Sequence, residues 1–423
     1  MKFNKKVLAN GLRVITVPMV DNPSVTVLVM VEAGSKYENK ATSGLSHFLE
    51  HMVFKGTPKR PKAIDISREL DSIGAHYNAF TGQEYTGYYA KADVRHTDTI
   101  LDVVSDMYLN PLFDAEEIKK EKGVIVEEIR MYKDLPQQHV QNIFMELLYG
   151  DVPAGWNIAG TEDNVKSFGR EDFVKYRSEH YLSNSTIIVV SGSFKEDEML
   201  RKIEKAFSSI EGGKKSDKLP VKEGQKVPMI KTEFKETDQT HLVIGTRTFS
   251  VKDKRIPAMH VLSTVLGRGM SSRLFAKMRD DLGICYYIKT DHNPFTDHGF
   301  LSISAGVDNS RVKEAVEGIL NECKRLKDEL VPVSEIKKAK DYIAGTTMLE
   351  LETSDARAVF CCEQEVMKKK IESPAEIIER INAVIAEDVQ SLAKEIFVNE
   401  GLNMAIIGRF KDGEEFKPYF KFK

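Results

Sequence analysis

Two histidines and a glutamate lie close together in a stretch that is expected to form a helix. Residues 44–57 read GLSHFLEHMVFKGT and contain His47, Glu50 and His51 in the order H-x-x-E-H. Residues four apart lie one turn apart on one side of a helix, so both imidazoles can reach a zinc ion at about 2.0–2.1 Å. Glu50 lies beside them, where a carboxylate can take a proton from a water activated by the metal. The pattern predicts a catalytic zinc site with Glu50 as general base.

The apolar residues of the same stretch support this interpretation. Leu45, Phe48, Leu49 and Met52 fall on the other side of the helix, which predicts that this side packs against a core. A histidine that only filled the core would lie among them. The alternative is a pair of exposed histidines that make surface hydrogen bonds.

A catalytic zinc site needs a third protein ligand. Glu121 and Glu128 lie seven residues apart in EKGVIVEEIRMYKD, so they share one face of a second predicted helix. The same spacing is also typical of a solvated acidic face. The spacing alone leaves both interpretations open.

The second half of the chain resembles the first at a nearly constant offset. Residues 114–129 resemble residues 332–347 at an offset of 218, and residues 171–194 resemble residues 387–410 at an offset of 216. Chance similarity between amphipathic helices is the alternative. The agreement of the two offsets predicts two copies of one domain.

The repeat bears on the third ligand. At the offset of 218, Glu121 and Glu128 correspond to Ala339 and Thr346, and the second copy has no H-x-x-E-H near its corresponding helix. Both parts of the predicted site are therefore absent from the second copy together. This joint absence is expected if one metal site is retained in the first copy.

A stretch rich in Gly, Lys and Pro, residues 211–228, divides the chain almost in half. We predict a zinc-bearing domain at residues 1–212, a linker at 213–228 and a homologous zinc-free domain at 229–423. In the first copy the strands are grouped rather than alternating singly with helices, which predicts an α+β fold. Each domain is expected to be a largely antiparallel sheet with helices packed on one face. The expected strands lie within residues 11–19, 24–34, 76–92 and 185–192, and the expected helices lie near residues 96–110, 114–133, 138–149 and 170–181.

Composition excludes several classes of protein. The 423 residues are 41% hydrophobic and 30% charged with a net charge of -3, which suggests neither a nucleic-acid partner nor a membrane surface. The apolar run at 25–31 is too short to span a bilayer, and the N-terminus lacks the features of a secretory signal. The four cysteines, Cys285, Cys323, Cys361 and Cys362, include no C-x-x-C pair. We expect a soluble cytoplasmic protein whose metal is held by histidine and carboxylate.

These motifs resemble the pitrilysin/insulinase family of zinc metallopeptidases, the inverzincins, and most closely its branch like mitochondrial processing peptidase. They are, in order, GLSHFLEHMVFKGT, GAHYNAFTGQEYTGYYAK, VIVEEI and GRGMSSRLFAKMRDDLGICYYI, and 76 residues separate His51 from Glu128. The resemblance implies that His47, His51 and Glu128 bind one Zn²⁺ per chain and that Glu50 is the general base. It also implies that Glu121 is the family's additional glutamate, which supports the ligands.

The resemblance further implies a strand that binds the substrate. HYNAFT at 76–81 matches an edge strand to which an extended peptide adds through main-chain hydrogen bonds, so Asn78, Ala79 and Phe80 would contact the substrate. The alternative is a half-buried strand, since alternating aromatic residues need no ligand to explain them.

Arg279 and Tyr286 match a pair that reaches the substrate from the zinc-free domain in this family. A guanidinium and a phenol are suitable donors to a peptide carbonyl or a developing oxyanion. A helix-end arginine and a strand tyrosine without such a role are the alternative. The chain departs from the family pattern at Arg268, Cys285 and Tyr287, which leaves specificity open.

The predicted function is that of a zinc-dependent endopeptidase acting on peptides or unfolded segments. Family chains with four such domains close into a chamber, whereas this chain has two, which implies a homodimer or a heterodimer with a related chain. One rival is a non-catalytic structural or partner subunit of the same fold. Another is a binding module with surface histidines and no metal.

Overall fold

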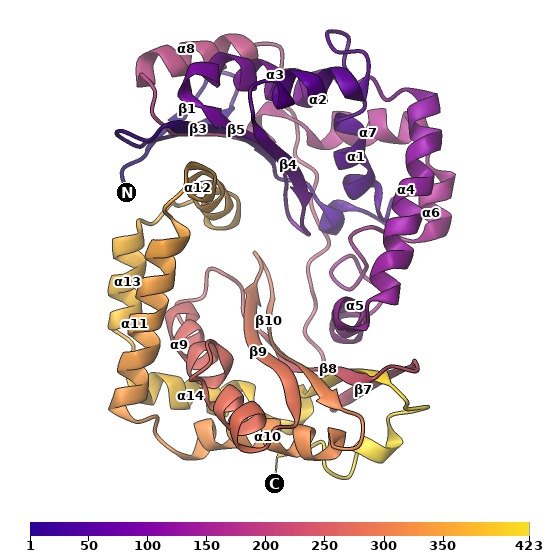
Figure 1. Cartoon of the computed structure of the whole chain (residues 1–423), viewed down its shortest axis with the longest axis vertical. Coiled ribbons are helices and arrows are strands. Elements are labelled where there is room, and N and C mark those ends of the chain that lie inside the picture. Colours follow the sequence, from indigo (N-terminus) through magenta and orange to yellow (C-terminus); the bar gives the residue numbers. More distant parts are fainter. Residues whose placement is uncertain (423) are drawn as a thin grey trace. The chain divides into compact units, whose positions relative to one another are not determined.

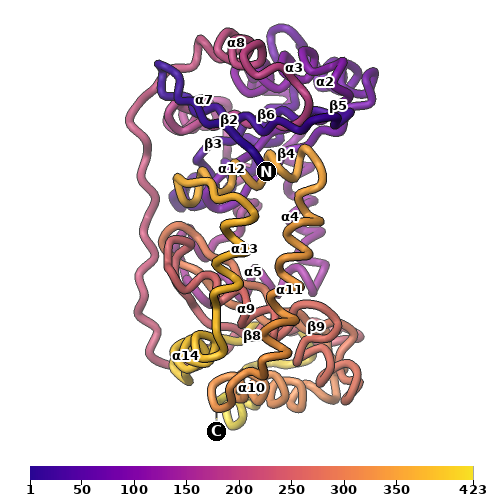
Figure 2. The backbone as a smooth tube through the Cα atoms, turned by 90° about the vertical axis from the view of Figure 1, so that its left-hand side faces the viewer, coloured from indigo at the N-terminus to yellow at the C-terminus, as the bar shows by residue number. Residues whose placement is uncertain are grey.

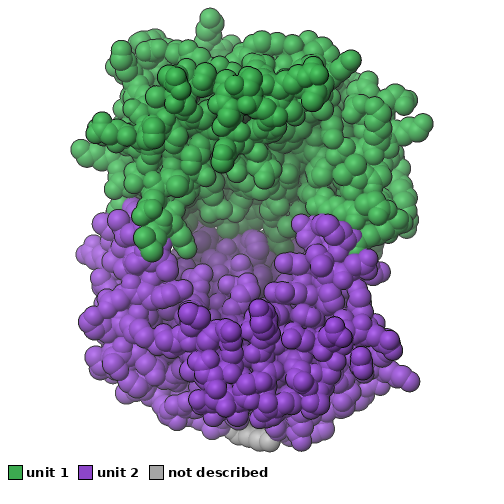
Figure 3. All heavy atoms as spheres, in the orientation of Figure 1, with its two compact units in different colours: residues 1–130, 156–219, 349–373 green, residues 131–155, 220–348, 374–423 purple. Residues whose placement is uncertain are grey.

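The computed structural model describes residues 1–422, which form two units (Figure 3). Unit 1 consists of Met1–Arg130, Trp156–Leu219 and Leu349–Ser373. Unit 2 consists of Met131–Gly155, Pro220–Met348 and the residues from Pro374 onward. Each half of the sequence therefore contributes a short stretch to the unit that is formed mainly by the other half. The predicted division into 1–212 and 229–423 concerns the repeat in the sequence and stays a prediction.

Unit 1 contains a six-stranded sheet in the order β1-β2-β6-β3-β5-β4. The pair β2–β6 is parallel and the other neighbours are antiparallel. Strand β4 is at the edge of the sheet, so one side of its backbone has no strand partner in the described chain. The strands are β1 (Asn4–Val7), β2 (Arg13–Pro18), β3 (Ser24–Val31), β4 (His76–Thr81), β5 (Thr86–Asp93) and β6 (Thr186–Gly192).

The helices of unit 1 pack on both faces of this sheet. One face forms a core with helices of the first half of the chain, among them α1 and α3. The opposite face packs against α12, which comes from the second half and lies on the side of the sheet away from α3 (Figure 1). The helices are α1 (Leu45–Val53), α2 (Ala63–Asp71), α3 (Thr97–Leu109), α4 (Ala115–Asp134), α6 (Glu162–Ser167), α7 (Arg170–His180), α8 (Glu196–Ala206) and α12 (Ser354–Lys368), with short 3₁₀ turns η1 (Ser35–Tyr37), η2 (Val94–His96) and η3 (Ser183–Ser185).

Unit 2 contains a five-stranded sheet in the order β7-β11-β8-β10-β9, with β7–β11 parallel and the other pairs antiparallel. Helix α5, from the first half of the chain, packs on β8 and β11. The strands are β7 (Met229–Phe234), β8 (Gln239–Thr248), β9 (Cys285–Pro294), β10 (Gly299–Asp308) and β11 (Asn403–Gly408). The helices are α5 (Pro136–Tyr149), α9 (Ile256–Gly267), α10 (Val312–Asp328), α11 (Val333–Glu350), α13 (Pro374–Asn382) and α14 (Ala386–Ile396), with the π-helical turn η4 (Phe275–Asp281) and the 3₁₀ turns η5 (Asn399–Gly401) and η6 (Glu414–Phe416).

The two sheets have the same topology. When β2, β6, β3, β5 and β4 are matched with β7, β11, β8, β10 and β9, the strand orders are identical and the parallel pairs coincide. Helices α5 and α12 begin at Pro136 and Ser354, which are 218 residues apart, the offset found in the sequence. The two copies therefore exchange equivalent helices, since each packs on the sheet of the other copy.

The predicted α+β class is confirmed, with two refinements. Each sheet is largely antiparallel, as predicted, and is mixed because it also contains one parallel pair. The helices of each half pack on one face of their own sheet, and the exchanged helix covers the second face. Residues 211–228 form no helix or strand, as expected for a linker, and are drawn as an extended trace in Figure 2.

A buried ionic cluster attaches α12 to the sheet of unit 1. The Glu365 carboxylate accepts hydrogen bonds from Lys5 Nζ at 2.7 Å and from Arg13 Nη1 at 3.3 Å. Arg13 also contacts Glu32, and Lys369 at the end of α12 reaches the same Glu32 at 2.5 Å. Because Arg13 and Glu365 are almost completely buried, each needs the other for charge compensation.

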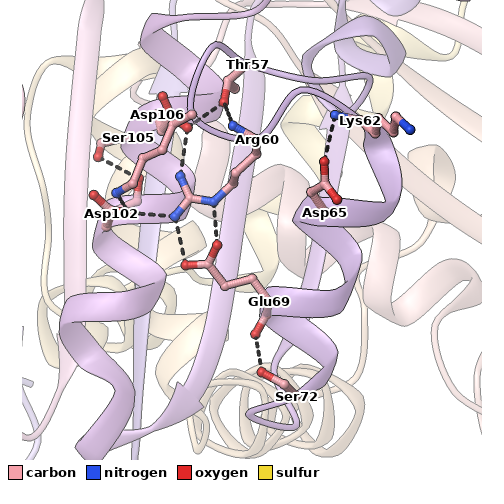
Figure 4. Close-up of polar contacts among 10 residues, drawn as sticks. Thr57, Arg60, Lys62, Asp65, Glu69, Ser72, Asp102, Ser105 and Asp106 are labelled. Carbon is pink, nitrogen blue, oxygen red and sulfur yellow. Dashed lines mark hydrogen bonds and ion pairs between the residues drawn. The ribbon is translucent and has the colours of Figure 1, made fainter.

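A second buried arginine fixes the loop that leaves α1 (Figure 4). Arg60 is 3% exposed, and its guanidinium donates to Glu69 on α2 and to Asp102 and Asp106 on α3 at 2.6–2.8 Å. Thr57 donates to the same Asp106 at 2.6 Å and accepts from the Arg60 amide at 2.9 Å. The loop therefore holds α1, α2 and α3 in one arrangement.

The remaining expectations from composition concern cysteines and membranes. All four cysteines are free and buried. Within residues 1–422, the helices are either too short or too polar to cross a bilayer.

The replacement Glu365→Gln is expected to lower the free energy of unfolding by about 3 kcal/mol, because it leaves the buried Arg13 guanidinium without one of its two carboxylates. Chemical denaturation followed by circular dichroism measures the change. Glu352→Gln is the matched control, since Glu352 is exposed just before α12 and has no ion pair in the described chain. Equal losses in both variants would contradict a specific role for the cluster.

Candidate metal centre

Helix α1 separates an apolar side from a polar side. Its three largest apolar side chains are fully buried in the core of unit 1: Phe48, Leu49 and Met52. The other side carries His47, Glu50 and His51, which are only partly buried. The packing of one side therefore fixes the direction in which the polar groups point.

The start of α1 is fixed by a buried carboxylate. Glu38 accepts hydrogen bonds from the Gly44 amide at 2.8 Å and the Ser46 amide at 2.7 Å, and from the Ser46 hydroxyl. These amides are among those that a helix N-terminus leaves unsatisfied. Gly44 has φ of 97°, and a Cβ there would lie 2.6 Å from the Ala159 carbonyl oxygen, so the turn into α1 needs glycine.

Three predicted ligands come together between α1 and α4. Glu128 Oε1 lies 3.7 Å from His47 Nε2, and Glu128 Oε2 lies 3.6 Å from His51 Nε2. In a tetrahedral zinc site, bonds of about 2.0–2.1 Å place the ligand atoms roughly 3.3 Å apart. These two separations are slightly larger, and one ligand atom from each of the three side chains lies within 4.8 Å of the other two, so one ion can reach all three after small adjustments. Among residues 1–422 this is the single group of three or more such side chains close enough to hold a metal.

Glu121 orients one of the histidines. Its Oε1 lies 2.9 Å from His51 Nδ1, which leaves Nε2 of His51 directed at Glu128. A hydrogen bond of this kind fixes the tautomer and ring orientation of a metal-binding imidazole. Lys55, one turn after His51 on the chain, pairs with the other oxygen of Glu121 at 2.6 Å.

The electrostatics of the two imidazoles differ. Burial and the neighbouring His51 lower the pKa of His47 to about 4, so His47 is neutral, the form that binds metals. For His51, burial lowers the pKa, but the hydrogen bond to Glu121 and the charges of Glu121, Glu128 and Glu50 outweigh it and raise the pKa. The carboxylates that favour a proton on His51 favour a bound cation for the same reason.

The donor set fits zinc. Two imidazoles and one carboxylate are a standard protein ligand set for catalytic zinc, which leaves one further position open. Nδ1 of His47 is buried and has no hydrogen-bond partner in the described chain, and the ring faces Glu128 with Nε2. Both histidines therefore direct Nε2 toward the Glu128 carboxylate.

Glu50 lies beside this group without being part of it. Its Oε2 accepts a hydrogen bond from the Thr81 hydroxyl at the end of β4. Burial raises the pKa of the Glu50 carboxyl and the nearby Glu128 raises it further, while the Thr81 bond and His51 lower it, and the net direction is upward. A carboxylate with a raised pKa accepts a proton more readily than an ordinary glutamate does.

The predicted substrate strand is the edge strand β4, which pairs with β5 alone. Ala79 packs against the core of unit 1, while Phe80 lies on the other face beside Tyr85 and over Gly87. Asn78 is exposed, and its side-chain oxygen accepts a hydrogen bond from the Ala79 amide. The free side of β4 fits the predicted addition of a peptide strand, and the contacts of Asn78, Ala79 and Phe80 with a substrate stay a prediction.

Arg279 and Tyr286 are neighbours in unit 2. Arg279 lies in η4, and its guanidinium is 4.8 Å from the centre of the Phe275 ring and 6.0 Å from that of Tyr286. Tyr286 is 74% exposed on β9. The two groups are thus held together and accessible, and their role toward a substrate stays a prediction.

The sequence interpretation gave no role to Thr81, Lys55 or Glu38. Thr81 lies in the quoted strand, two residues after Ala79, and strand periodicity places it on the same face as Ala79. That periodicity was the available signal. The acidic neighbour Glu127, in contrast, is 72% exposed and pairs with Arg130 at 2.8 Å, away from the ligands.

Family models match most of the chain. The model described as insulinase (peptidase family M16) matches residues 13–162, and that described as peptidase M16 inactive domain matches residues 167–343. The first range contains His47, His51 and Glu128. The second range contains Ala339, the counterpart of Glu121.

Curated relatives are similar over nearly their whole length. An uncharacterized zinc protease of Bacillus subtilis, YmxG, is 36% identical over 394 residues, which cover 92% of this chain and 95% of the relative. An uncharacterized zinc protease of Rickettsia bellii is 33% identical over 407 residues, covering 96% and 97%.

Solved structures share the fold. A protease from Helicobacter pylori matches with a TM-score of 0.90 at 22% identity, covering 96% of this chain and 99% of that one. A chain of complex III2 from Candida albicans matches with a TM-score of 0.86 at 17% identity, covering 99% and 98%. From the family models and the curated relatives together, the chain belongs to the insulinase family of peptidases, family M16, and is a zinc protease of that family.

Proposed function

We propose that this chain is a zinc endopeptidase that cleaves peptides or unfolded segments, with one Zn²⁺ per chain held by His47, His51 and Glu128. The observation that carries the proposal is the convergence of these three side chains beside Glu50. When bound there, zinc would polarise the scissile carbonyl and lower the pKa of a water molecule to about 7. The two zinc-protease relatives support the choice of metal.

Glu50 is the general base in this proposal. It takes a proton from the attacking water and then gives it to the leaving amine, so it acts first as base and then as acid. Its Oε2 is occupied by the Thr81 hydroxyl, and the described chain makes no hydrogen bond to Oε1. Oε1 is therefore the oxygen that is available for the proton. Glu121 does not touch the reacting groups and acts by holding His51.

The substrate is proposed to be an extended peptide that adds to β4. A free sheet edge offers main-chain donors and acceptors to any extended segment, which accounts for affinity without strict sequence selection. Asn78, Ala79 and Phe80 would lie along the bound peptide. A folded protein does not offer a free extended segment, so unfolded chains are the preferred class.

Arg279 and Tyr286 are proposed to donate hydrogen bonds to the substrate carbonyl and to the oxyanion that develops during attack. Their mutual contact and the high exposure of Tyr286 support a role outside the core.

A two-domain chain is proposed to act as a dimer, with a second copy or a related chain completing an enclosed chamber. We place this enzyme in the cytoplasm, in keeping with its composition. The molecular mass in solution, measured by light scattering, distinguishes the monomer from the dimer.

The rival function is that of a non-catalytic subunit. The likeness to a chain of complex III2 means that the fold alone does not decide between enzyme and structural component. The complete set of three ligands, Glu50 and Glu121 favours the enzyme, because a structural role requires none of them in this geometry.

Glu50→Gln is expected to reduce kcat on an unstructured fluorogenic peptide by at least about 100-fold, because the amide cannot accept the proton. Bound zinc should remain near one per chain, since Glu50 is not a ligand. Glu127→Gln, an exposed change on α4, is the control and should behave as wild type. Equal cleavage by wild type and Glu50→Gln would refute the base role.

His51→Ala is expected to lose most of the bound zinc, because it removes both a ligand and the group that Glu121 orients. Elemental analysis of the purified, dialysed protein gives the metal content. Retention of stoichiometric zinc would show that the metal is bound elsewhere.

Glu121→Gln is expected to weaken zinc binding by about 10- to 100-fold without abolishing it, because His51 keeps an acceptor but loses a charged one. Competition with a chelator of known affinity measures the change. Glu127→Gln is again the control, and an unchanged zinc affinity in Glu121→Gln would remove Glu121 from the metal centre.

A further inference from the structure

Thr81 is in direct contact with the proposed general base. Its hydroxyl donates to Glu50 Oε2, and no other residue of the described chain makes a hydrogen bond to this carboxylate. Thr81 has no other side-chain partner in the same part of the chain. The pair links residue 81 on β4 with residue 50 on α1, two elements that pack together.

The face of β4 that carries Thr81 is the face toward α1. Successive residues of a strand point to opposite faces, so Tyr77, Ala79 and Thr81 share one face. Tyr77 and Ala79 pack against the core that contains the apolar side of α1. Thr81 continues this row and reaches the polar side of the same helix.

The backbone at Thr81 is held from several directions. Thr81 pairs with Thr86 across the turn to β5, and the Thr86 hydroxyl donates to the Ala33 carbonyl at 2.9 Å. The turn that follows accepts backbone hydrogen bonds at Gly82 from Ser35, at 3.2 Å, and at Gln83 from Lys36, at 2.9 Å.

The segment of residues 33–38, which contains Ala33, Ser35 and Lys36, also holds α1. Residues 33–38 contact the turn after β4 and, through Glu38, the first amides of α1. A Cβ at Gly34 would lie 2.3 Å from the Gly82 carbonyl oxygen, so the segment and the turn are in close contact. The donor Thr81 and the acceptor Glu50 are therefore positioned by one common support.

We propose that Thr81 is a positioning residue, which holds Oε2 of Glu50 so that Oε1 faces the scissile bond of a peptide bound along β4. This inference rests on the proposed function. Thr81 belongs to the strand with which the substrate would pair. The same strand would therefore fix the position of the base relative to the substrate backbone. A carboxylate that rotates freely would spend less time in the reactive geometry.

The proposal predicts that loss of the Thr81 hydroxyl lowers turnover but leaves substrate binding nearly unchanged. Thr81→Val keeps the size and β-branched shape of the side chain but removes the hydroxyl. The backbone edge of β4 and the metal ligands are unchanged, so substrate binding and zinc content should persist. We expect kcat to fall about 10- to 100-fold while KM changes less than about two-fold. Thr81→Ser restores the hydroxyl and should recover most of kcat.

A purely structural role for Thr81 predicts a different result. The bond would then only fasten α1 to β4, and its loss would lower the melting temperature with no change in kcat well below that temperature. Thr240→Val is the matched control, since it removes a buried strand hydroxyl that contacts Asn309 in unit 2 rather than Glu50. It should leave kcat within about two-fold of wild type.

The test compares wild type, Thr81→Val, Thr81→Ser, Thr240→Val and Glu50→Gln for kcat and KM on one fluorogenic peptide, together with zinc content. Peptide affinity of Glu50→Gln with and without Thr81→Val, measured by fluorescence anisotropy, supplies a readout independent of turnover and should be equal. Wild-type kcat in Thr81→Val, failure of serine to rescue, loss of zinc, or an equal effect of Thr240→Val would overturn the inference. Full activity of Glu50→Gln would instead overturn the proposed function, whatever Thr81→Val does.

Discussion

The packing of α1 is the constraint on which the metal centre depends. Its buried side chains, among them Phe48 and Met52, pack the helix onto the sheet of unit 1, and this packing determines the side of the helix from which His47 and His51 project. A rotation of α1 that brought the imidazoles out of line with Glu128 would also expose apolar surface. Since burying a large apolar side chain is worth about 1.5–3 kcal/mol, the core itself resists such a rotation. The site is thus held by hydrophobic packing before any metal is present.

Polar contacts supply the precision that packing cannot. Apolar packing sets the position of a helix, but hydrogen bonds set the rotation of individual carboxylates and rings. Around α1 these come from Glu38 at its start, from Glu121 on α4 and from Thr81 on β4. Arg60 fixes the loop at its end. Every one of them belongs to unit 1, so the ligands and the base are set by the folding of that unit.

The sequence was most informative where chemistry is local. The spacing of His47 and His51 and the helical face of Glu128 are set by helix geometry, so they could be predicted without knowledge of tertiary contacts. Thr81 was missed because its partner lies 31 residues away: strand periodicity predicts the face on which Thr81 lies, but not the residue that it contacts there. The parallel strand pairs and the exchange of α5 and α12 were missed for the same reason. A strand sequence that is apolar on both faces of a sheet indicates that other segments pack on both faces, but it does not indicate which segments these are.

The helix exchange has a consequence for the origin of the chain. In a single ancestral copy with this connectivity, the helix equivalent to α5 would not pack on the sheet of its own copy. The apolar face of that sheet would then need a helix from another molecule. Such a protein would be a domain-swapped homodimer. Gene duplication and fusion would turn that intermolecular swap into one within a single polypeptide. In such a history one copy could lose its metal ligands, while both copies would still have to fold together.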